Sequence, residues 1–364
     1  MSIAIAASPA AQPVRTDRGV GLWLFAIAAL IGLMVVVGGL TRLTGSGLSI
    51  TEWQPVTGVI PPLNDAAWQA EFAKYQGTPQ YELINRGLGL AGFKAIYWWE
   101  WSHRLLGRLL GVVFLVPFLL FLKQRRIDRG IAVRLAIIFL LGAAQGVLGW
   151  WMVQSGLTGT RVVVSQYRLA AHLGLAMILF GYVFWTGLEI IGARQTRIGP
   201  AARFRPWAVG LVGLVFVQII LGAFMAGLDA GRAFQTWPTY GGMWVPPGLY
   251  DLSPWWINHF ENHALVHFQH RTVGYAVAVM VVWLYAALRR AGADKPLKIA
   301  GIHAVVLTAM QIALGVLTVV SGVALPLAAL HQVCALGLFG TALWWAYALN
   351  GNAIPQALPG AGRR

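Results

Sequence analysis

Residues 96–122 read IYWWEWSHRLLGRLLGVVFLVPFLLFL, an apolar run whose few ionisable side chains lie near its start. The run is longer than the about 20 residues that an α-helix needs to cross the hydrocarbon core of a bilayer. Similar runs recur along the chain and predict eight transmembrane spans, at roughly 21–41, 96–122, 134–153, 166–191, 206–228, 263–288, 299–320 and 326–349. The composition agrees, because 58% of the 364 residues are hydrophobic and only 11% are charged, whereas a soluble domain carries about 25% charged residues. The sequence therefore predicts an all-α membrane protein.

The basic residues orient these spans. Of the 27 Lys and Arg residues, 17 lie at the termini and in every second connection: Arg15, Arg18, Lys123, Arg125, Arg126, Arg129, Arg134, Arg194, Arg197, Arg203, Arg205, Arg289, Arg290, Lys295, Lys298, Arg363 and Arg364. Because cytoplasmic connections carry an excess of Lys and Arg, we expect both termini in the cytoplasm and a multi-pass protein of the bacterial inner membrane. A nucleic-acid-binding protein would place the net charge of +15 on one face of a soluble domain, so we expect no nucleic acid partner.

An internal repeat divides the chain into two halves. The segment Glu100-Trp-Ser-His103-Arg104-Leu-Leu-Gly107 recurs as His267-Phe-Gln-His270-Arg271-Thr-Val-Gly274. Ala171-His172 recurs as Leu330-His331, and each of these histidines is followed at the same distances by Phe-Gly and then by Trp. Gln145-x-x-Leu148-Gly149 matches Gln311-x-x-Leu314-Gly315, and the loop motif Trp53-Gln-Pro55 matches Trp237-Pro238. The predicted units are a tail (1–20), an N-terminal half (21–192), a linker (193–205), a C-terminal half (206–350) and a second tail (351–364). Four spans per unit keep both copies in one orientation, which predicts two parallel-repeat four-helix bundles related by a pseudo-twofold axis along the membrane normal.

Four histidines carry the predicted chemistry. His103, His172, His270 and His331 lie five to eight residues from the extracytoplasmic ends of their spans, a depth of about 8–12 Å. Each half supplies two of them from different helices, and two imidazoles facing each other across a bundle are the usual ligands of a b-type haem. We expect Gly107, Gly174 and Gly274 to leave space for the macrocycle, and Arg104 and Arg271 to pair with haem propionates. The alternatives are histidines that only pack against neighbouring carbonyls, and a zinc site, although no thiolate or further carboxylate completes either pair.

The two halves differ beside one ligand. Glu100 lies three residues before His103, so both side chains project from the same helix face, and the equivalent residue before His270 is His267. A carboxylate near the macrocycle can accept a proton or stabilise developing positive charge. We therefore expect the N-terminal half to do the chemistry and the C-terminal half to transfer electrons. The alternative is that Glu100 only forms an ion pair with Arg104 or Arg108.

These motifs resemble the haem A synthase family, in its alphaproteobacterial and mitochondrial branch. The resemblance rests on three segments: GGLTRLTGSGLS from Gly38, EWQPVTG from Glu52 followed by Ile60-Pro-Pro62, and Glu100-x-x-His103-Arg104-x-x-Gly107-Arg108 with its partner Phe268-x-His270-Arg271. It implies conversion of haem O to haem A by oxidation of the C8 methyl group to a formyl group in successive hydroxylations, for terminal oxidases of the cytochrome c oxidase type.

The resemblance also implies roles for individual residues. His103 and His172 would flank the substrate haem O, Glu100 would be the catalytic acid, and His270 and His331 would ligate a resident haem b. The family usually has Gln where this chain has His267, and this chain lacks the cysteine pair that the Bacillus-like branch carries in its first extracytoplasmic loop. Implied partners are membrane lipid, a haem O synthase (a farnesyltransferase), oxidase assembly factors and an electron donor that the sequence does not identify.

Two other functions explain part of this pattern. A two-haem b-type electron-transfer protein that oxidises quinol accounts for the histidines but gives Glu100 no task. A transporter with parallel repeats accounts for the duplication, but it predicts charged residues near the bilayer midplane. The ionisable residues instead lie near one surface, which favours the synthase.

Overall fold

The computed structural model describes residues 17–159, 161–192 and 199–350, and it confirms the all-α fold with eight helices long and apolar enough to cross a membrane. These helices are α1 (Arg18–Leu43), α4 (Leu90–Lys123), α5 (Arg129–Leu157), α6 (Gln166–Ile191), α7 (Arg205–Gly227), α9 (His263–Arg290), α10 (Lys295–Val320) and α11 (Leu325–Ala348). Each corresponds to one predicted span. Shorter helices occupy the connections: η1 (Thr57–Val59), α2 (Asp65–Gln76), α3 (Pro79–Leu83), η2 (Gly199–Phe204), η3 (Ala230–Arg232), η4 (Trp255–Ile257) and α8 (Asn258–Glu261).

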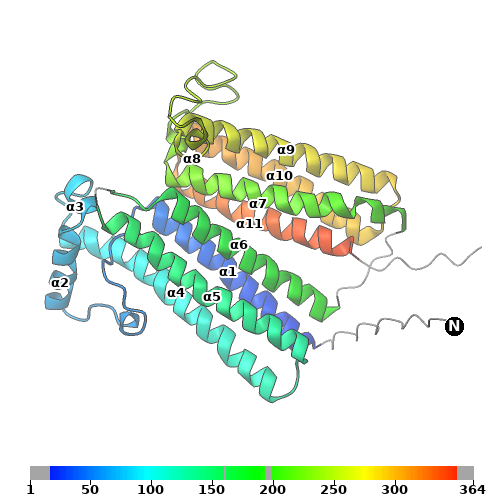
Figure 1. Ribbon diagram of the computed structural model, residues 1–364, viewed down its shortest axis with the longest axis horizontal. Helices are drawn as coiled ribbons and strands as arrows, with labels where there is room; N and C mark the ends of the chain where they lie inside the picture. Colours follow the sequence, from blue (N-terminus) through cyan, green and yellow to red (C-terminus); the bar gives the residue numbers. More distant parts are fainter. Residues whose placement is uncertain (1–16, 160, 193–198, 351–364) are drawn as a thin grey trace, which may run out of the picture.

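The eight long helices form two four-helix bundles that lie side by side (Figure 1). In the first bundle α1, α4, α5 and α6 pack in a ring, and α7, α9, α10 and α11 pack in the same order in the second. The bundles meet where α6 packs against α7 and α11, and where α1 packs against α11. The repeat-equivalent residues Phe180 and Phe339 contact each other there, with ring centroids 6.2 Å apart. Contacts between equivalent residues are a pattern that a twofold axis produces, but the pseudo-twofold axis along the membrane normal stays a prediction.

Polar side chains mark where the helices begin. The Asp17 carboxylate accepts hydrogen bonds from the backbone N–H groups of Gly19 and Val20 at the start of α1, and Asp128 caps α5 in the same way through Ile131. Such caps satisfy N–H groups that have no partner within the helix. The Asp17 carboxylate also accepts two hydrogen bonds of 2.7 Å from the Arg126 guanidinium, so the contact ties the start of α1 to the loop after α4.

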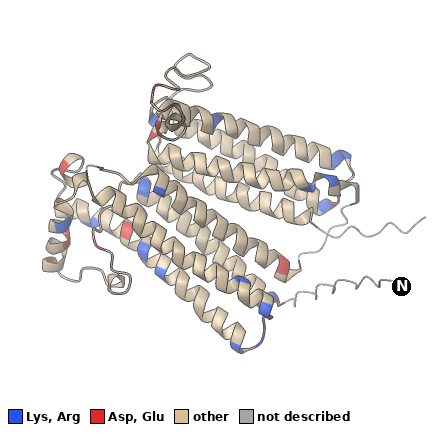
Figure 2. Cartoon of the chain, in the orientation of Figure 1, with Lys and Arg blue, Asp and Glu red and all other residues tan. Residues whose placement is uncertain are grey.

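Basic residues gather at the ends of the spans nearest the N-terminal tail, whereas acidic residues of the first long loop lie at the opposite end (Figure 2). This distribution agrees with the charge asymmetry that the sequence predicts. Five of the basic residues used in that prediction, namely Arg15, Arg194, Arg197, Arg363 and Arg364, lie outside the described residues.

The first long loop is held on the outer end of α4 by an aromatic cluster. Trp68, Phe72 and Tyr75 of α2 pack against Phe93 and Tyr97 of α4, and all five side chains are buried. This cluster fixes the loop beside the part of α4 that carries the predicted site residues.

Candidate functional site

The structure brings the two predicted ligands of the C-terminal half together. The ring centroids of His270 on α9 and His331 on α11 are 6.3 Å apart, and the ring planes are 71° to each other. With about 2 Å for a metal–imidazole bond and about 1 Å from the bonding nitrogen to the ring centre, two imidazoles on one metal ion have centroids about 6 Å apart. The two rings therefore have the separation that a shared haem iron requires.

In the N-terminal half, His103 projects from α4 and His172 from α6. Buried ring nitrogens in both halves, His172 Nδ1 and His331 Nδ1, have no hydrogen-bond partner among the described residues. His267 Nδ1 is likewise without a partner among these residues. Because buried polar atoms in native proteins nearly always have a partner, the free nitrogens of His172 and His331 are available to a bound group, and their role as ligands stays a prediction.

A glycine of a neighbouring helix lies against each of the four rings. A Cβ atom added at Gly38 or Gly149 would lie 3.0 Å from the ring of His103 or His172, respectively. A Cβ atom added at Gly222 would lie 3.3 Å from His270, and one at Gly315 would lie 3.0 Å from His331. Glycine at these positions lets the ring approach the helix backbone closely.

These glycines differ from the ones we expected from the sequence. Among the expected glycines, Gly174 faces Ile220 across the interface between the halves, and Gly274 faces the amide of Gln218. The difference arises because the glycine that borders a ring lies on an adjacent helix, not on the helix that carries the histidine. The signal for two of them was present in the repeated Gln-x-x-Leu-Gly motif, which ends at Gly149 and Gly315.

Glutamine side chains fix the helices that carry the ligands. Gln145 of α5 donates a 2.8 Å hydrogen bond to the backbone carbonyl of His172, and Gln218 of α7 donates one of 2.9 Å to that of His270. Gln311, the repeat equivalent of Gln145, lies 3.2 Å from the ring nitrogen Nε2 of His331. A hydrogen bond between helices inside a membrane stabilises their relative position, so these amides hold the histidine-bearing helices in place.

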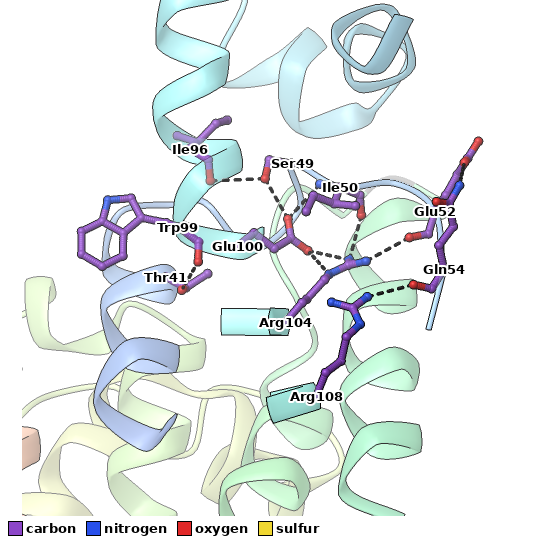
Figure 3. A network of polar contacts seen from close by, with 10 residues as sticks. All are labelled: Thr41, Ser49, Ile50, Glu52, Gln54, Ile96, Trp99, Glu100, Arg104 and Arg108. Atoms are coloured by element: carbon purple, nitrogen blue, oxygen red, sulfur yellow. Dashed lines mark hydrogen bonds and ion pairs between the residues drawn. The ribbon is translucent and has the colours of Figure 1, made fainter. Parts of the chain in front are cut away.

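Glu100 is buried in a network at the outer end of the N-terminal bundle (Figure 3). Its Oε2 accepts hydrogen bonds of 2.8 Å from the Ser49 hydroxyl and from the backbone N–H of Ile50. Its Oε1 accepts two from the Arg104 guanidinium, at 2.6 and 3.1 Å. The ion pair with Arg104 that we considered as the alternative for Glu100 is therefore present, and the carboxylate holds the start of the first loop against α4.

Arg104 and Arg108 fix the same loop. Besides Glu100, Arg104 donates to the carbonyls of Ile50 and Glu52, each at 2.9 Å, and Arg108 donates to those of Gln54 and Pro55. Every nitrogen of the Arg104 guanidinium thus has an acceptor within the protein. In this arrangement Arg104 binds loop carbonyls, whereas the sequence led us to expect it beside a haem propionate.

The repeat preserves this arrangement in the C-terminal half. Arg271 donates to the carbonyls of Thr236 and Pro238 and lies over the ring of Tyr240, at 4.1 Å from its centroid. Tyr275, the equivalent of Arg108, accepts a hydrogen bond from the Trp237 indole. In each half the helix that carries the first ligand thus also binds the Trp-Pro segment of the long loop.

His267 takes the position of Glu100 in this second network. The side chain is 1% exposed, its Nε2 lies 3.2 Å from Arg271, and its ring lies between Phe234 and Tyr240. His267 is therefore a partner of Arg271 rather than a third ligand beside His270. Within the described ranges, no group of three or more His, Cys, Asp or Glu side chains is placed to hold a metal ion.

Outside the spans, a lysine of α2 completes the loop network. Lys74 contacts Glu52 at 3.0 Å and Glu71 at 2.8 Å. The hydrogen bond from Lys74 keeps the pKa of the Glu52 carboxyl below its ordinary value. Glu52 and Glu71 thus share one lysine as their counter-charge.

Comparisons with known proteins cover both halves. The family described as cytochrome oxidase assembly protein matches residues 21–343. A protein of Parvibaculum lavamentivorans named "Heme A synthase" is 50% identical over 338 residues, which cover 92% of this chain and 96% of that protein. Proteins of the same name from Paracoccus denitrificans and Nitrosospira multiformis are 50% and 43% identical, over 87% and 92% of this chain and 84% and 94% of their own length. The span matched by the family, residues 21–343, contains the positions of all four histidines and Glu100.

Proposed function

Because the chain belongs to the haem A synthase family of cytochrome oxidase assembly proteins, we propose that it makes haem A by oxidising the C8 methyl group of haem O to a formyl group. The conversion adds one oxygen atom, removes two hydrogen atoms and raises the oxidation level of the carbon by four electrons, which corresponds to successive two-electron hydroxylations. The chain is then an oxidoreductase that supplies haem A to terminal oxidases.

The observation that carries the proposal is the pair of neighbouring imidazoles in the C-terminal half, His270 and His331, whose 6.3 Å centroid separation would let both bind one iron. We assign a resident haem b to His270 and His331. When bound, this haem supplies one-electron redox chemistry. The protein contributes the fixed spacing of the rings, the two glycines that border them and the amides of Gln218 and Gln311.

The N-terminal half is assigned to the substrate. His103 and His172 flank haem O, and Gly38 and Gly149 let their rings lie close to the helix backbones. The C-terminal half has no carboxylate equivalent to Glu100, because His267 occupies the corresponding position there. We assign to Glu100 the proton transfer that accompanies breakage of the methyl C–H bond, and to Arg104 the positioning of its carboxylate.

The distribution of basic residues supports the cellular location and the orientation of the chain in the membrane. The gathering of basic residues at one end of the spans supports a place in the bacterial inner membrane with both termini in the cytoplasm. A haem O synthase and oxidase assembly factors are the partners that this function requires, since haem O must enter from the membrane and haem A must leave to an oxidase.

Extraction of the bound pigments tests the proposal. The protein is purified from cells that lack their own enzyme, and the haems are separated by chromatography. We expect haem b together with haem O, an alcohol intermediate or haem A. Haem b alone would support the two-haem electron-transfer protein instead, and the absence of haem would support the transporter. The variant His270→Ala should lose the low-spin haem b spectrum, whereas His267→Gln should keep it.

A further inference from the structure

A pocket lies between the first long loop, α2 and α4. Its volume is about 420 Å³, and small-molecule sites in proteins occupy about 300–1,000 Å³. Ile60, Pro61 and Leu63 of the loop line it together with Arg104 and Arg108 of α4. None of the four histidines is among the described residues that line it, so the pocket is separate from the histidine sites.

Arg108 brings a positive charge to this pocket without a counter-charge. Its Nε and Nη2 atoms donate to the carbonyls of Pro55 and Gln54, at 2.9 and 2.8 Å, whereas its Nη1 atom is buried and has no hydrogen-bond partner among the described residues. Arg104 beside it is paired with Glu100 (Figure 3), but Arg108 forms no ion pair within the described part of the chain. Because a buried donor without a partner is costly, the Arg108 guanidinium has both the charge and the free donor to bind an anion.

The α2 side of the pocket carries the complementary charge. Glu52 and Glu71 line it and share Lys74 as their counter-charge, at 3.0 and 2.8 Å. Two carboxylates with one ammonium leave one negative charge, whereas Arg104 is neutralised by Glu100. The charged residues around the pocket therefore leave one uncompensated charge of each sign, positive on α4 and negative beside α2.

The depth of Arg108 places the pocket at the surface of the membrane. From Arg108 to Lys123, the last residue of α4, the helix rises about 22 Å. The hydrocarbon core of a bilayer is about 30 Å thick, so Arg108 lies about 8 Å inside the outer boundary when Lys123 lies at the inner one, and its long side chain extends to the loop at that boundary. Ile60 and Leu63 beside the pocket are 66% and 78% exposed. An amphiphile bound here has its polar group in the pocket and its apolar chains beside these two residues.

We propose that this pocket binds the headgroup of a zwitterionic phospholipid with a primary ammonium, such as phosphatidylethanolamine. The phosphate accepts charge-assisted hydrogen bonds from the Arg108 guanidinium, and the ammonium donates to the carboxylates of Glu52 and Glu71. One headgroup thus supplies both charges that the pocket leaves uncompensated. The bound lipid joins α2 and the first long loop to α4, and it adds to the contacts that hold the loop in place.

The C-terminal half serves as an internal comparison. Tyr275 occupies the position of Arg108 and accepts a hydrogen bond from the Trp237 indole, whereas Arg271 donates to loop carbonyls as Arg104 does. A neutral phenol gives a phosphate no counter-charge. We therefore expect the headgroup site in the N-terminal half alone.

The test measures lipid binding, so its outcome does not depend on haem A formation. Delipidated protein in detergent is titrated with short-chain phosphatidylethanolamine, with phosphatidylglycerol of the same chain length and with inorganic phosphate, and binding is followed by native mass spectrometry and thermal unfolding. Because only phosphatidylethanolamine supplies an ammonium for the carboxylates, we expect the wild type to bind it at least about tenfold more tightly than phosphatidylglycerol. Arg108→Gln should weaken the binding of phosphatidylethanolamine at least about tenfold, since it removes the charge-assisted hydrogen bonds to the phosphate.

Two further variants separate headgroup binding from loss of the fold. Glu71→Gln keeps the loop contacts of Arg108 and should reduce the preference for phosphatidylethanolamine over phosphatidylglycerol about tenfold, so it decides the question even where Arg108→Gln unfolds. Tyr275→Phe, the matched change in the C-terminal half, should leave both affinities within about twofold of the wild type. Equal affinities of the wild type for the two lipids, inorganic phosphate that binds as tightly as phosphatidylethanolamine, or a preference that Glu71→Gln leaves unchanged would overturn the inference.

Discussion

Replacing Glu100 by histidine separates its structural role from its chemical one. The C-terminal half contains this solution already, because His267 lies at the equivalent position and pairs with Arg271 at 3.2 Å. Glu100→His should therefore keep a partner for Arg104 while it removes the carboxylate. Glu100→Gln is the contrasting change, since an amide nitrogen would face either the Arg104 guanidinium or the donors of Ser49 and Ile50.

The burial and hydrogen bonds of the Glu100–Arg104 pair set the expected changes in the free energy of unfolding. Glu100 is 2% exposed, and the side chain of Arg104 is 14% exposed. Breaking a buried ion pair by removing one partner costs about 3–5 kcal/mol. Because Arg104 keeps two carbonyl acceptors, we expect Glu100→Gln to lower the free energy of unfolding by about 3 kcal/mol, at the low end of that range. Glu100→His loses charge-assisted hydrogen bonds but leaves Arg104 paired, so about 1–2 kcal/mol is expected.

The assay measures haem A formed in cells that lack their own enzyme, together with the reduced haem b spectrum and thermal unfolding in detergent. A positioned general acid or base contributes about 100-fold or more to a rate, so Glu100→His should reduce haem A formation by about that factor while the haem b spectrum stays normal. Normal haem A formation in Glu100→His would refute the chemical role of Glu100 and leave only its part in holding the loop.

Three further predictions concern other contacts. His331→Ala should abolish the low-spin haem b spectrum, and an unchanged reduced spectrum would refute the ligand assignment. Gly39→Ala should destabilise the interface between the bundles by about 1 kcal/mol, because the new Cβ would lie 1.7 Å from the Gln332 amide oxygen and would displace the amide from its hydrogen bond to the Val35 carbonyl. In thermal unfolding, Gly39→Ala/Gln332→Ala should lose less than the sum of the single variants. The Arg126 guanidinium lowers the pKa of Asp17 from 3.8 to about 2, so the stabilisation that Asp17 contributes is complete above about pH 4 and is lost as the pH falls toward 2. Asp17→Asn should thus unfold about 1 kcal/mol more easily than the wild type at pH 7, and a difference that persists at pH 2 would contradict this reasoning.

The sequence alone determined the spans and the repeat, and it predicted the pairs of histidines. Spans can be recognised from sequence because the thickness of the bilayer sets the length of each apolar run, and each helix satisfies its own backbone hydrogen bonds. The repeat then placed His103 with His172 and His270 with His331, since both copies must have the same helix order. Comparison of the two copies also singled out Glu100, because this position holds a carboxylate in one copy and the imidazole of His267 in the other.

Only the tertiary structure decided what surrounds these residues. The partner of Arg104 and the glycine that borders each ring depend on how one helix is rotated against another, or on where a long loop folds back. Helix rotation and loop position result from packing between segments far apart in the sequence, and inside a membrane close packing rather than hydrophobicity decides how helices associate. A hydrophobic pattern therefore shows where each helix crosses the membrane, but the packed bundle shows which side chains meet.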